Sequence, residues 1–168
     1  MARGFQLTKD SYLAILSERE AIRWVLTNNK LAFTSAASHK EAKALKPMDE
    51  MFLYVTRGAW HNPKRHRGQI VGYASATSRQ LQFAEPLWIQ GRVFLTYVDI
   101  RVERLVGLHQ GLDLQPLAKE LEAFPKPLAW YTYLRRSLLP LTKADATTLR
   151  RLIPGYADAP ASIYATYF

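Results

Sequence analysis

The densest group of side chains that could do chemistry is a cluster of cations and imidazoles near the middle of the chain. It falls within eleven residues and comprises Arg57, His61, Lys64, Arg65, His66 and Arg67. Guanidinium groups bind phosphate oxygens in a bidentate fashion, and ammonium groups bind them as point charges. Trp60 lies among them, where an indole could stack on a base or wedge between two bases. A polyanion is the first partner to expect, although a solvated loop that only aids solubility would have the same composition.

The imidazoles of this cluster also invite comparison with metal-dependent nucleases of the His-Asn-His type. His61 is followed by Asn62, and His66 lies four residues further on. Such a site needs additional oxygen or nitrogen ligands in a strand–strand–helix context, whereas a long apolar strand follows His66. The neighbouring cations would also repel a metal ion. The sequence therefore favours no catalytic residues, no metal site and no cofactor, and metal-dependent cleavage remains a third reading.

Carboxylates that could act as an acid–base pair occur at Asp99 and Glu103. On a strand they would point to the same side, and Arg101 and Arg104 lie beside them, which is typical of a salt-bridged surface. No serine-hydrolase, zinc-protease, phosphate-loop or dinucleotide-binding motif occurs. The sequence predicts a protein that is not an enzyme.

Composition limits the class of protein further. The chain has 168 residues, a formal charge of +9 and no cysteine, so disulfides and thiolate ligands are excluded. No apolar run is long enough to cross a bilayer, and the first residues lack the apolar region of a secretory signal. We expect a single domain over residues 1–168, with a core at about 12–153 and an aromatic tail at 154–168. We also expect a soluble, cytoplasmic protein with no membrane partner.

Hydrophobic periodicity and capping signals predict short strands interspersed with helices. Two strands flank a basic segment at 59–68, one beginning at Met51 and the other ending near Ala76. Ser17 is a candidate cap for a helix at 19–27, and Thr142 for one at 143–152. The other expected elements are strands at 12–16, 31–33, 93–102 and 130–134, helices ending at 45 and spanning 114–124, and a loop at 80–92. This order indicates a mixed α+β fold with about six strands in a curved or barrelled sheet and helices at its ends.

Three segments resemble a known family. Residues 13–18 are similar to the Lys-Ser-Glu-Pro opening of EVE domains, with Leu16 in place of the Lys and Arg19 in place of the Pro. Residues 46–54 resemble the Gly-Asp turn and aromatic strand of that family, and residues 70–74 resemble its Ile-Val-Gly strand. The order of elements is similar to the EVE and YTH branch of PUA-like domains over 12–153. The resemblance implies a curved β-barrel with flanking helices and a pocket at the helix–barrel seam for a base flipped from DNA or RNA, often a modified one.

The resemblance also implies candidate residues for the base pocket. Phe33 and Trp88 occupy positions where YTH readers place aromatic walls, although both would serve equally well in core packing. The polar candidates lie near the strand ends, where Ser17 and Glu18 could bond a base edge or simply cap a helix. The full set expected in the pocket is Ser17, Glu18, Phe33, Thr34, Ser35, Tyr54 and Trp88.

A separate set of residues is expected on the phosphate-binding surface. Arg135-Arg136-Ser137 resembles a late segment of the family in which an arginine faces phosphate. The cationic cluster would extend this surface, so the full set is Arg57, Trp60, Lys64, Arg65, Arg67, Arg135 and Arg136.

Together these features predict a non-catalytic module that binds nucleic acid and receives one base, with a modified base as the leading candidate. The alternative is a domain that binds a free nucleoside-like molecule, in which the cationic cluster has no role. The sequence leaves open whether DNA or RNA is bound, which modification is read, and whether a protein partner or a weak homodimer is formed through the aromatic tail.

Overall fold

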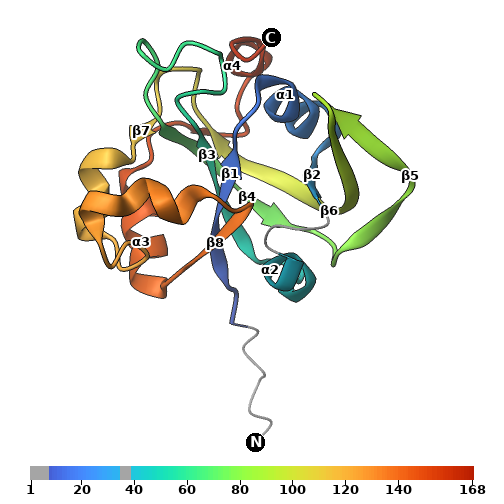
Figure 1. The fold of residues 1–168 in the computed structure, drawn as a ribbon, viewed down its shortest axis with the longest axis horizontal. Coiled ribbons are helices and arrows are strands. Elements are labelled where there is room, and N and C mark those ends of the chain that lie inside the picture. Colours follow the sequence, from blue (N-terminus) through green and yellow to red (C-terminus); the bar gives the residue numbers. More distant parts are fainter. Residues whose placement is uncertain (1–7, 35–38) are drawn as a thin grey trace, which may run out of the picture.

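A curled β-sheet organises the chain in the computed structural model, which describes residues 8–34 and 39–168 (Figure 1). Its main path runs β2-β6-β4-β3-β1-β8, and β5, β7 and β9 add to it at the sides. The strands are β1 (Ser11–Leu16), β2 (Lys30–Phe33), β3 (Glu50–Val55), β4 (Gln69–Ala76), β5 (Leu81–Ile89), β6 (Arg92–Leu105), β7 (Leu112–Asp113), β8 (Leu138–Leu141) and β9 (Tyr156–Ala157). The helices are α1 (Arg19–Asn28), α2 (His39–Ala44), α3 (Lys143–Leu152) and α4 (Ala161–Ala165), with 3-10 segments η1 (Gln115–Glu120) and η2 (Pro127–Leu134).

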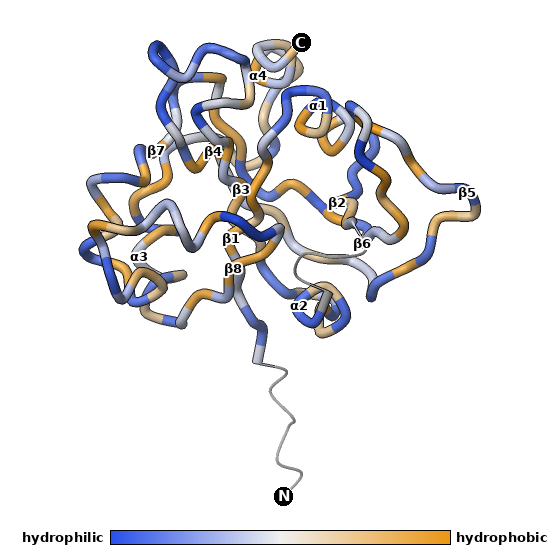
Figure 2. Tube along the Cα trace, viewed as in Figure 1, coloured by the Kyte–Doolittle hydropathy of each residue, from blue (hydrophilic) through white to orange (hydrophobic). Residues whose placement is uncertain are grey.

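The two faces of the sheet bury two different cores, and β3 contributes to both. Met51, Leu53 and Val55 pack with α1 residues on one side. Phe52 and Tyr54 pack on the other side, where η1 and α3 cover the sheet. This division follows the alternation of side chains along a strand, and β3 is buried along its whole length because both faces are covered. Figure 2 shows the resulting hydrophobic strands at the centre and hydrophilic loops at the periphery.

The curl of the sheet depends on β6, its longest strand. The first half of β6 pairs with β2 and β5, and its second half pairs with β4. The register with β4 shifts between Tyr73 and Ala74, and an irregularity of this kind bends a strand and increases its twist. The chain therefore has the mixed α+β fold with a six-strand, half-barrel sheet that the sequence predicts.

Several elements lie where local patterns place them. Helix α3 begins after Thr142, whose side chain accepts a hydrogen bond from the Asp145 backbone N–H at 3.1 Å. The strands β1, β2, β3 and β4 and the helix α1 also match their expected positions to within a few residues. Ser17, however, does not cap α1. The N-cap is Glu18, which makes no side-chain capping bond, and Ser17 directly follows β1, where its hydroxyl lies near Arg92.

Three expected elements differ from the structure. Residues 80–92 form strand β5 and a turn rather than a loop, and this strand ends in a two-residue turn in which Gln90 and Gly91 both have positive φ. Residues 114–124 form only the short segment η1, which ends at Glu120 because the backbone of Leu121 is extended, with φ −103° and ψ 132°. Residues 130–134 lie in the 3-10 segment η2 and not in a strand.

The aromatic tail folds back onto the sheet and α1. Tyr167 is buried, and its hydroxyl donates a 2.5 Å hydrogen bond to the carbonyl of Val106. The Arg23 side chain of α1 donates to the Tyr167 carbonyl at 2.7 Å. The tail thus contains an ordered arm with a short strand and a short helix, one of the two forms expected. Across residues 8–34 and 39–168, no helix is both long and apolar enough to cross a membrane.

Candidate nucleic-acid interface

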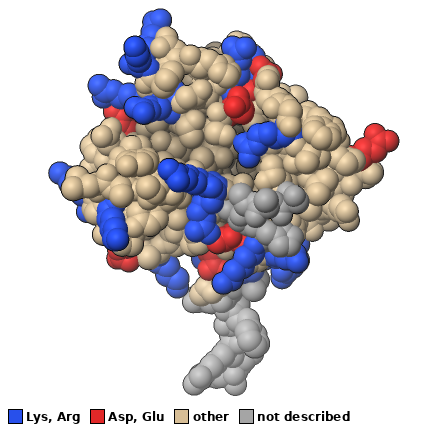
Figure 3. Space-filling model, viewed as in Figure 1, with Lys and Arg blue, Asp and Glu red and all other residues tan. Residues whose placement is uncertain are grey.

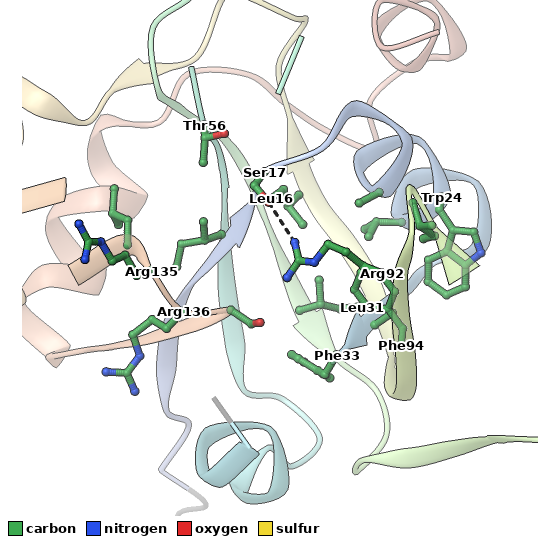
Figure 4. A pocket seen from close by; sticks show the side chains of 17 residues that line it. Leu16, Ser17, Trp24, Leu31, Phe33, Thr56, Arg92, Phe94, Arg135 and Arg136 are labelled. Atoms are coloured by element: carbon green, nitrogen blue, oxygen red, sulfur yellow. Dashed lines mark hydrogen bonds between the residues drawn. The ribbon is translucent and has the colours of Figure 1, made fainter. Parts of the chain in front are cut away.

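A pocket of about 270 Å³ lies at the seam between α1 and the open side of the sheet (Figure 4). The end of β1, the strand β2, the β5–β6 hairpin and the segment at 134–137 converge around it. Its volume is near the lower end of the range found for small-molecule pockets. Its lining consists of Ile15, Leu16, Ser17, Ala21, Trp24, Val25, Leu31, Ala32, Phe33, Thr56, Ile89, Arg92, Phe94, Leu134, Arg135, Arg136 and Ser137.

Three aromatic side chains contribute to the apolar wall of this pocket. Phe33 on β2 is only 1% exposed and belongs to the core as well as to the lining. Phe94 follows on β6, and Trp24 of α1 contributes to the edge of the lining, while its ring packs edge-on against Phe83 at 5.9 Å. A wall of this kind favours a flat apolar or aromatic ligand.

The polar groups of the pocket come from opposite sides of it. Arg92 extends across the pocket to the hydroxyl of Ser17, with 3.4 Å between the Arg92 Nη1 and Ser17 Oγ atoms (Figure 4). Its guanidinium carbon also lies 5.8 Å from the centre of the Phe94 ring. A contact as long as 3.4 Å holds the guanidinium only weakly, so its other N–H groups can bond a ligand.

Two further arginines form the opposite rim. Arg136 is held by an ion pair with Glu41 and donates to the Leu138 carbonyl at 2.7 Å. Arg135 is exposed and forms no ion pair with any residue that the structure describes. Arg135 is therefore free to meet an anion, whereas binding through Arg136 has to compete with its carboxylate partner.

The structure brings together only part of the pocket set expected from the sequence. Ser17 and Phe33 line the pocket. Thr34 follows β2 but is not in the lining, and Ser35 lies outside the described residues. Glu18 is also outside the lining, and its carboxylate lies 3.9 Å from His61 Nε2.

Tyr54 and Trp88 do not line the pocket, which corrects the expectation for both. Tyr54 is 2% exposed and packs in the second core, because its neighbours Leu53 and Val55 take the face toward α1. Trp88 is 68% exposed, while the next residue, Ile89, lines the pocket. Successive side chains of a strand point to opposite faces, so only one of these two neighbours could reach the pocket.

Sequence reasoning missed Trp24, Arg92 and Phe94. For Trp24 a signal existed, since Ala21, Trp24 and Val25 share one face of an amphipathic helix. For Arg92 and Phe94, the two-residue turn at Gln90-Gly91 was a signal for a hairpin. Because side chains alternate along a strand, two residues that are two positions apart lie on the same face.

The cationic loop, defined here as residues 56–68, is joined to the mouth of the pocket. The Arg19 backbone N–H donates to the Ala59 carbonyl at 3.2 Å, and Thr56 at the start of the loop lines the pocket. Figure 3 shows Lys and Arg atoms over this loop and around the central hollow of the same face. The loop therefore extends the positive surface that begins at the pocket rim.

The residues of this loop differ in whether their side chains are exposed and already paired. Arg57, Lys64 and Arg65 are exposed and form no ion pair within the described part of the chain. Arg67 pairs with Asp113 at 2.9 Å. Trp60 is partly buried against the core, with its ring centre 6.4 Å from that of Tyr167, so it is not available as a wedge.

The acidic residues do not assemble a metal centre within residues 8–34 and 39–168, where no group of three or more His, Cys, Asp or Glu side chains is placed to share an ion. Arg101 and Glu103 form a surface ion pair at 2.8 Å, and Asp99 pairs with Lys30 at 2.6 Å. Asp99 and Glu103 therefore form ion pairs with surface cations, as their neighbouring arginines led us to expect.

Comparison with known proteins relates the chain to others through its fold. No family model matches the sequence, and no curated protein matches it. A hypothetical protein from Leishmania major has a similar structure, with a TM-score of 0.58, 14% identity, and coverage of 86% of this chain and 94% of that one. Human THYN1, solved in complex with DNA containing 5-methylcytosine, gives a TM-score of 0.56 and 15% identity, covering 86% of this chain and 97% of that one.

The YTH domain of Mmi1, solved in complex with RNA, gives a TM-score of 0.56 and 12% identity, covering 86% of this chain and 77% of that one. At these identities the likeness concerns the arrangement of strands and helices and not particular residues. The chain therefore shares the fold of the Mmi1 YTH domain and of human THYN1, in agreement with the fold expected from the resemblance to EVE and YTH domains.

Proposed function

We propose that this protein binds nucleic acid and holds one base, extruded from its strand, in the pocket at the α1–sheet seam. The observation that carries the proposal is the joining of two features on one face. An aromatic-walled pocket opens beside arginines, and a loop rich in unpaired cations begins at its rim. A neutral base suits the first feature and the phosphate backbone suits the second.

The chemistry of the pocket indicates which base edges it accepts. Arg92 offers only donors, and the Ser17 hydroxyl offers one donor and acceptor lone pairs. A base edge rich in acceptors would therefore be bonded best. A methyl group on the base would contact Phe33 and Phe94 instead of water, and this favours a modified base.

The energetics of extrusion are feasible. Unstacking a base costs a few kcal/mol, and each base–aromatic stack returns about 1–3 kcal/mol. Charge-assisted hydrogen bonds from Arg92 would offset the remainder, at about 1.5–3 kcal/mol each. The similar folds of THYN1 and the Mmi1 YTH domain, solved with methylated DNA and with RNA, support a nucleic-acid ligand.

The test is fluorescence anisotropy with short DNA and RNA oligonucleotides, unmodified or carrying one modified base, at several salt concentrations. The pocket variants are Ser17→Ala and Phe94→Leu, because Phe33 is so deeply buried that Phe33→Ala would cost about 3–5 kcal/mol of folding free energy. We expect the preference for one modified base to fall about 5- to 150-fold, which corresponds to 1–3 kcal/mol. Arg101→Gln, in an exposed ion pair with Glu103, is the control and should leave the preference unchanged.

The cationic loop is tested by Lys64→Ala and Arg65→Ala. The slope of log affinity against log salt is negative. Each removed phosphate contact should make it less steep by about 0.7–0.9, while the base preference persists. Binding of a free nucleoside with an affinity that salt does not change, and no binding of oligonucleotides, would overturn the proposal in favour of a small-molecule site.

A further inference from the structure

A pair of stacked histidines joins the cationic loop to the β6–β7 connection. The Nδ1 atoms of His66 and His109 are 3.3 Å apart, and the ring centres are 4.4 Å apart with 19° between the planes. The two residues are 43 positions apart in sequence, so the pairing is a product of the fold. They form one wall of an open cavity of about 520 Å³ that is also lined by Arg65, Arg67 and Gln69.

The charges around the pair are mostly positive. Arg65 and Arg67 face it from the loop, and Asp113 on β7 is the one carboxylate that the described residues place beside these groups. Asp113 is already engaged, since it accepts from Arg67 at 2.9 Å and from the Gln69 side chain at 2.8 Å. Burial acts to raise the pKa of Asp113, but these hydrogen bonds and the charge of Arg67 outweigh it and lower the pKa. The carboxylate therefore stays charged and remains committed to Arg67.

The surroundings of His109 disfavour its protonated form. Burial lowers the pKa of His109, and the nearby His66 and Arg65 lower it further. An anion placed between these groups would reverse that effect, because it supplies the counter-charge that the imidazolium lacks. Proton uptake and anion binding would then favour one another.

We propose that His66, His109 and Arg65 form an oxyanion site that receives a backbone phosphodiester of the bound nucleic acid, with an affinity that increases as the pH falls. This site extends the function proposed above and depends on it for the identity of its ligand. The occupant is argued from position, because Thr56 lines the base pocket and also a small cavity that reaches His66 and His109. A strand with one base in the pocket would have its neighbouring phosphates above this same loop.

The expected size of the effect follows from reciprocal coupling. If the phosphodiester binds preferentially when His109 is protonated, its affinity rises up to tenfold for each unit that the pH falls between the titration midpoints of His109 in the bound and free protein. A phosphodiester does not titrate in this range, so the protein alone would account for the change.

Two measurements test the site on the full chain. In the first, the C–H resonances of the imidazoles are followed by NMR against pH, with sulfate or with chloride at the same ionic strength. We expect sulfate to raise the titration midpoint of His109, and no difference between the two salts would overturn the proposal.

In the second, oligonucleotide affinity is measured by anisotropy from pH 8 to pH 5.5 for the parent, His66→Gln and His109→Gln. We expect both variants to lose most of the increase at low pH. His61→Gln is the matched control, because His61 is an exposed histidine of the same loop that faces Glu18 instead of this pair. An equal loss in all three variants, or in none, would refute the site.

Failure of the site and failure of the proposed function give different results. If the modified-base preference depends on Phe94 but the pH dependence survives in His66→Gln and His109→Gln, only the oxyanion site is wrong. If sulfate raises the His109 midpoint while oligonucleotides bind with the same affinity at every pH, the site takes a free oxyanion and the phosphodiester assignment is overturned.

Discussion

Replacing Tyr54 by Phe should remove part of the protein's sensitivity to alkali without affecting ligand binding. Tyr54 lies in β3 and is buried in the second core, and this burial raises the pKa of its phenol to about 12, with nearby Arg57 acting in the opposite direction. In the unfolded chain the phenol titrates near its ordinary value of 10.0. Because the folded pKa is the higher one, the stabilisation is fully present below pH 10 and is lost as the pH rises toward 12.

The magnitude follows from the difference between the two pKa values. Two pKa units correspond to about 2.7 kcal/mol when the loss is complete. At pH 11 the unfolded phenol is mostly ionised and the folded one is not, so about 1.4 kcal/mol is already lost. Tyr54→Phe cannot ionise and should avoid this loss. At neutral pH its free energy of unfolding should differ from the parent by about 1 kcal/mol or less, since only a hydroxyl is removed.

The assay is urea unfolding followed by circular dichroism at pH 7, 9, 10, 10.5 and 11. Circular dichroism is preferable because ionised tyrosine would quench the fluorescence of the four tryptophans. The difference between parent and variant cancels the other groups that titrate in alkali. Parallel curves from pH 9 to pH 11 would refute the reasoning. Oligonucleotide affinity should match the parent, and a loss of base preference would mean that Tyr54 does contribute to the pocket.

Three further substitutions, one of them with a matched control, test how the fold is held together. Gly72→Ala would place a methyl group 2.0 Å from a backbone carbonyl oxygen of β6 and should lower the free energy of unfolding by about 3 kcal/mol or more. Gly58→Ala is the control, because a methyl group there would have nothing within 4 Å and should change stability little. Equal urea midpoints for the two variants would contradict this. Asp145→Ala removes a buried carboxylate that accepts two backbone N–H groups at 2.8 and 2.9 Å, so unfolding should become easier by about 3 kcal/mol or more. Tyr167→Phe leaves the Val106 carbonyl without this donor, and we expect a loss of about 1–3 kcal/mol and a melting temperature lower by a few degrees.

Much of the fold could be predicted from the sequence because it depends on interactions between residues close together in the chain. The period-2 pattern around the cationic loop identified β3 and β4, and Thr142 identified the start of α3. Sequence motifs similar to EVE domains identified the fold as a whole. The failures occurred where local signals were ambiguous, as in β5, which is mostly exposed and contains Pro86, and therefore resembles a loop until pairing with β6 fixes it as a strand.

The candidate site was less accessible to sequence reasoning because side-chain direction depends on register. Ser17, Phe33, Arg135 and Arg136 were found from motifs, but the same motifs could not show that Ile89 rather than Trp88 faces the pocket.

By itself, the sequence determined the positive charge of the protein, the position of its cationic loop and the strands that flank it, since these depend on composition and on short-range patterns. Only the tertiary structure decided that Arg92 crosses to Ser17 and that His66 stacks on His109, because these pairs are 75 and 43 residues apart. Contacts over such separations are fixed by how the sheet curls, and no local propensity encodes that geometry.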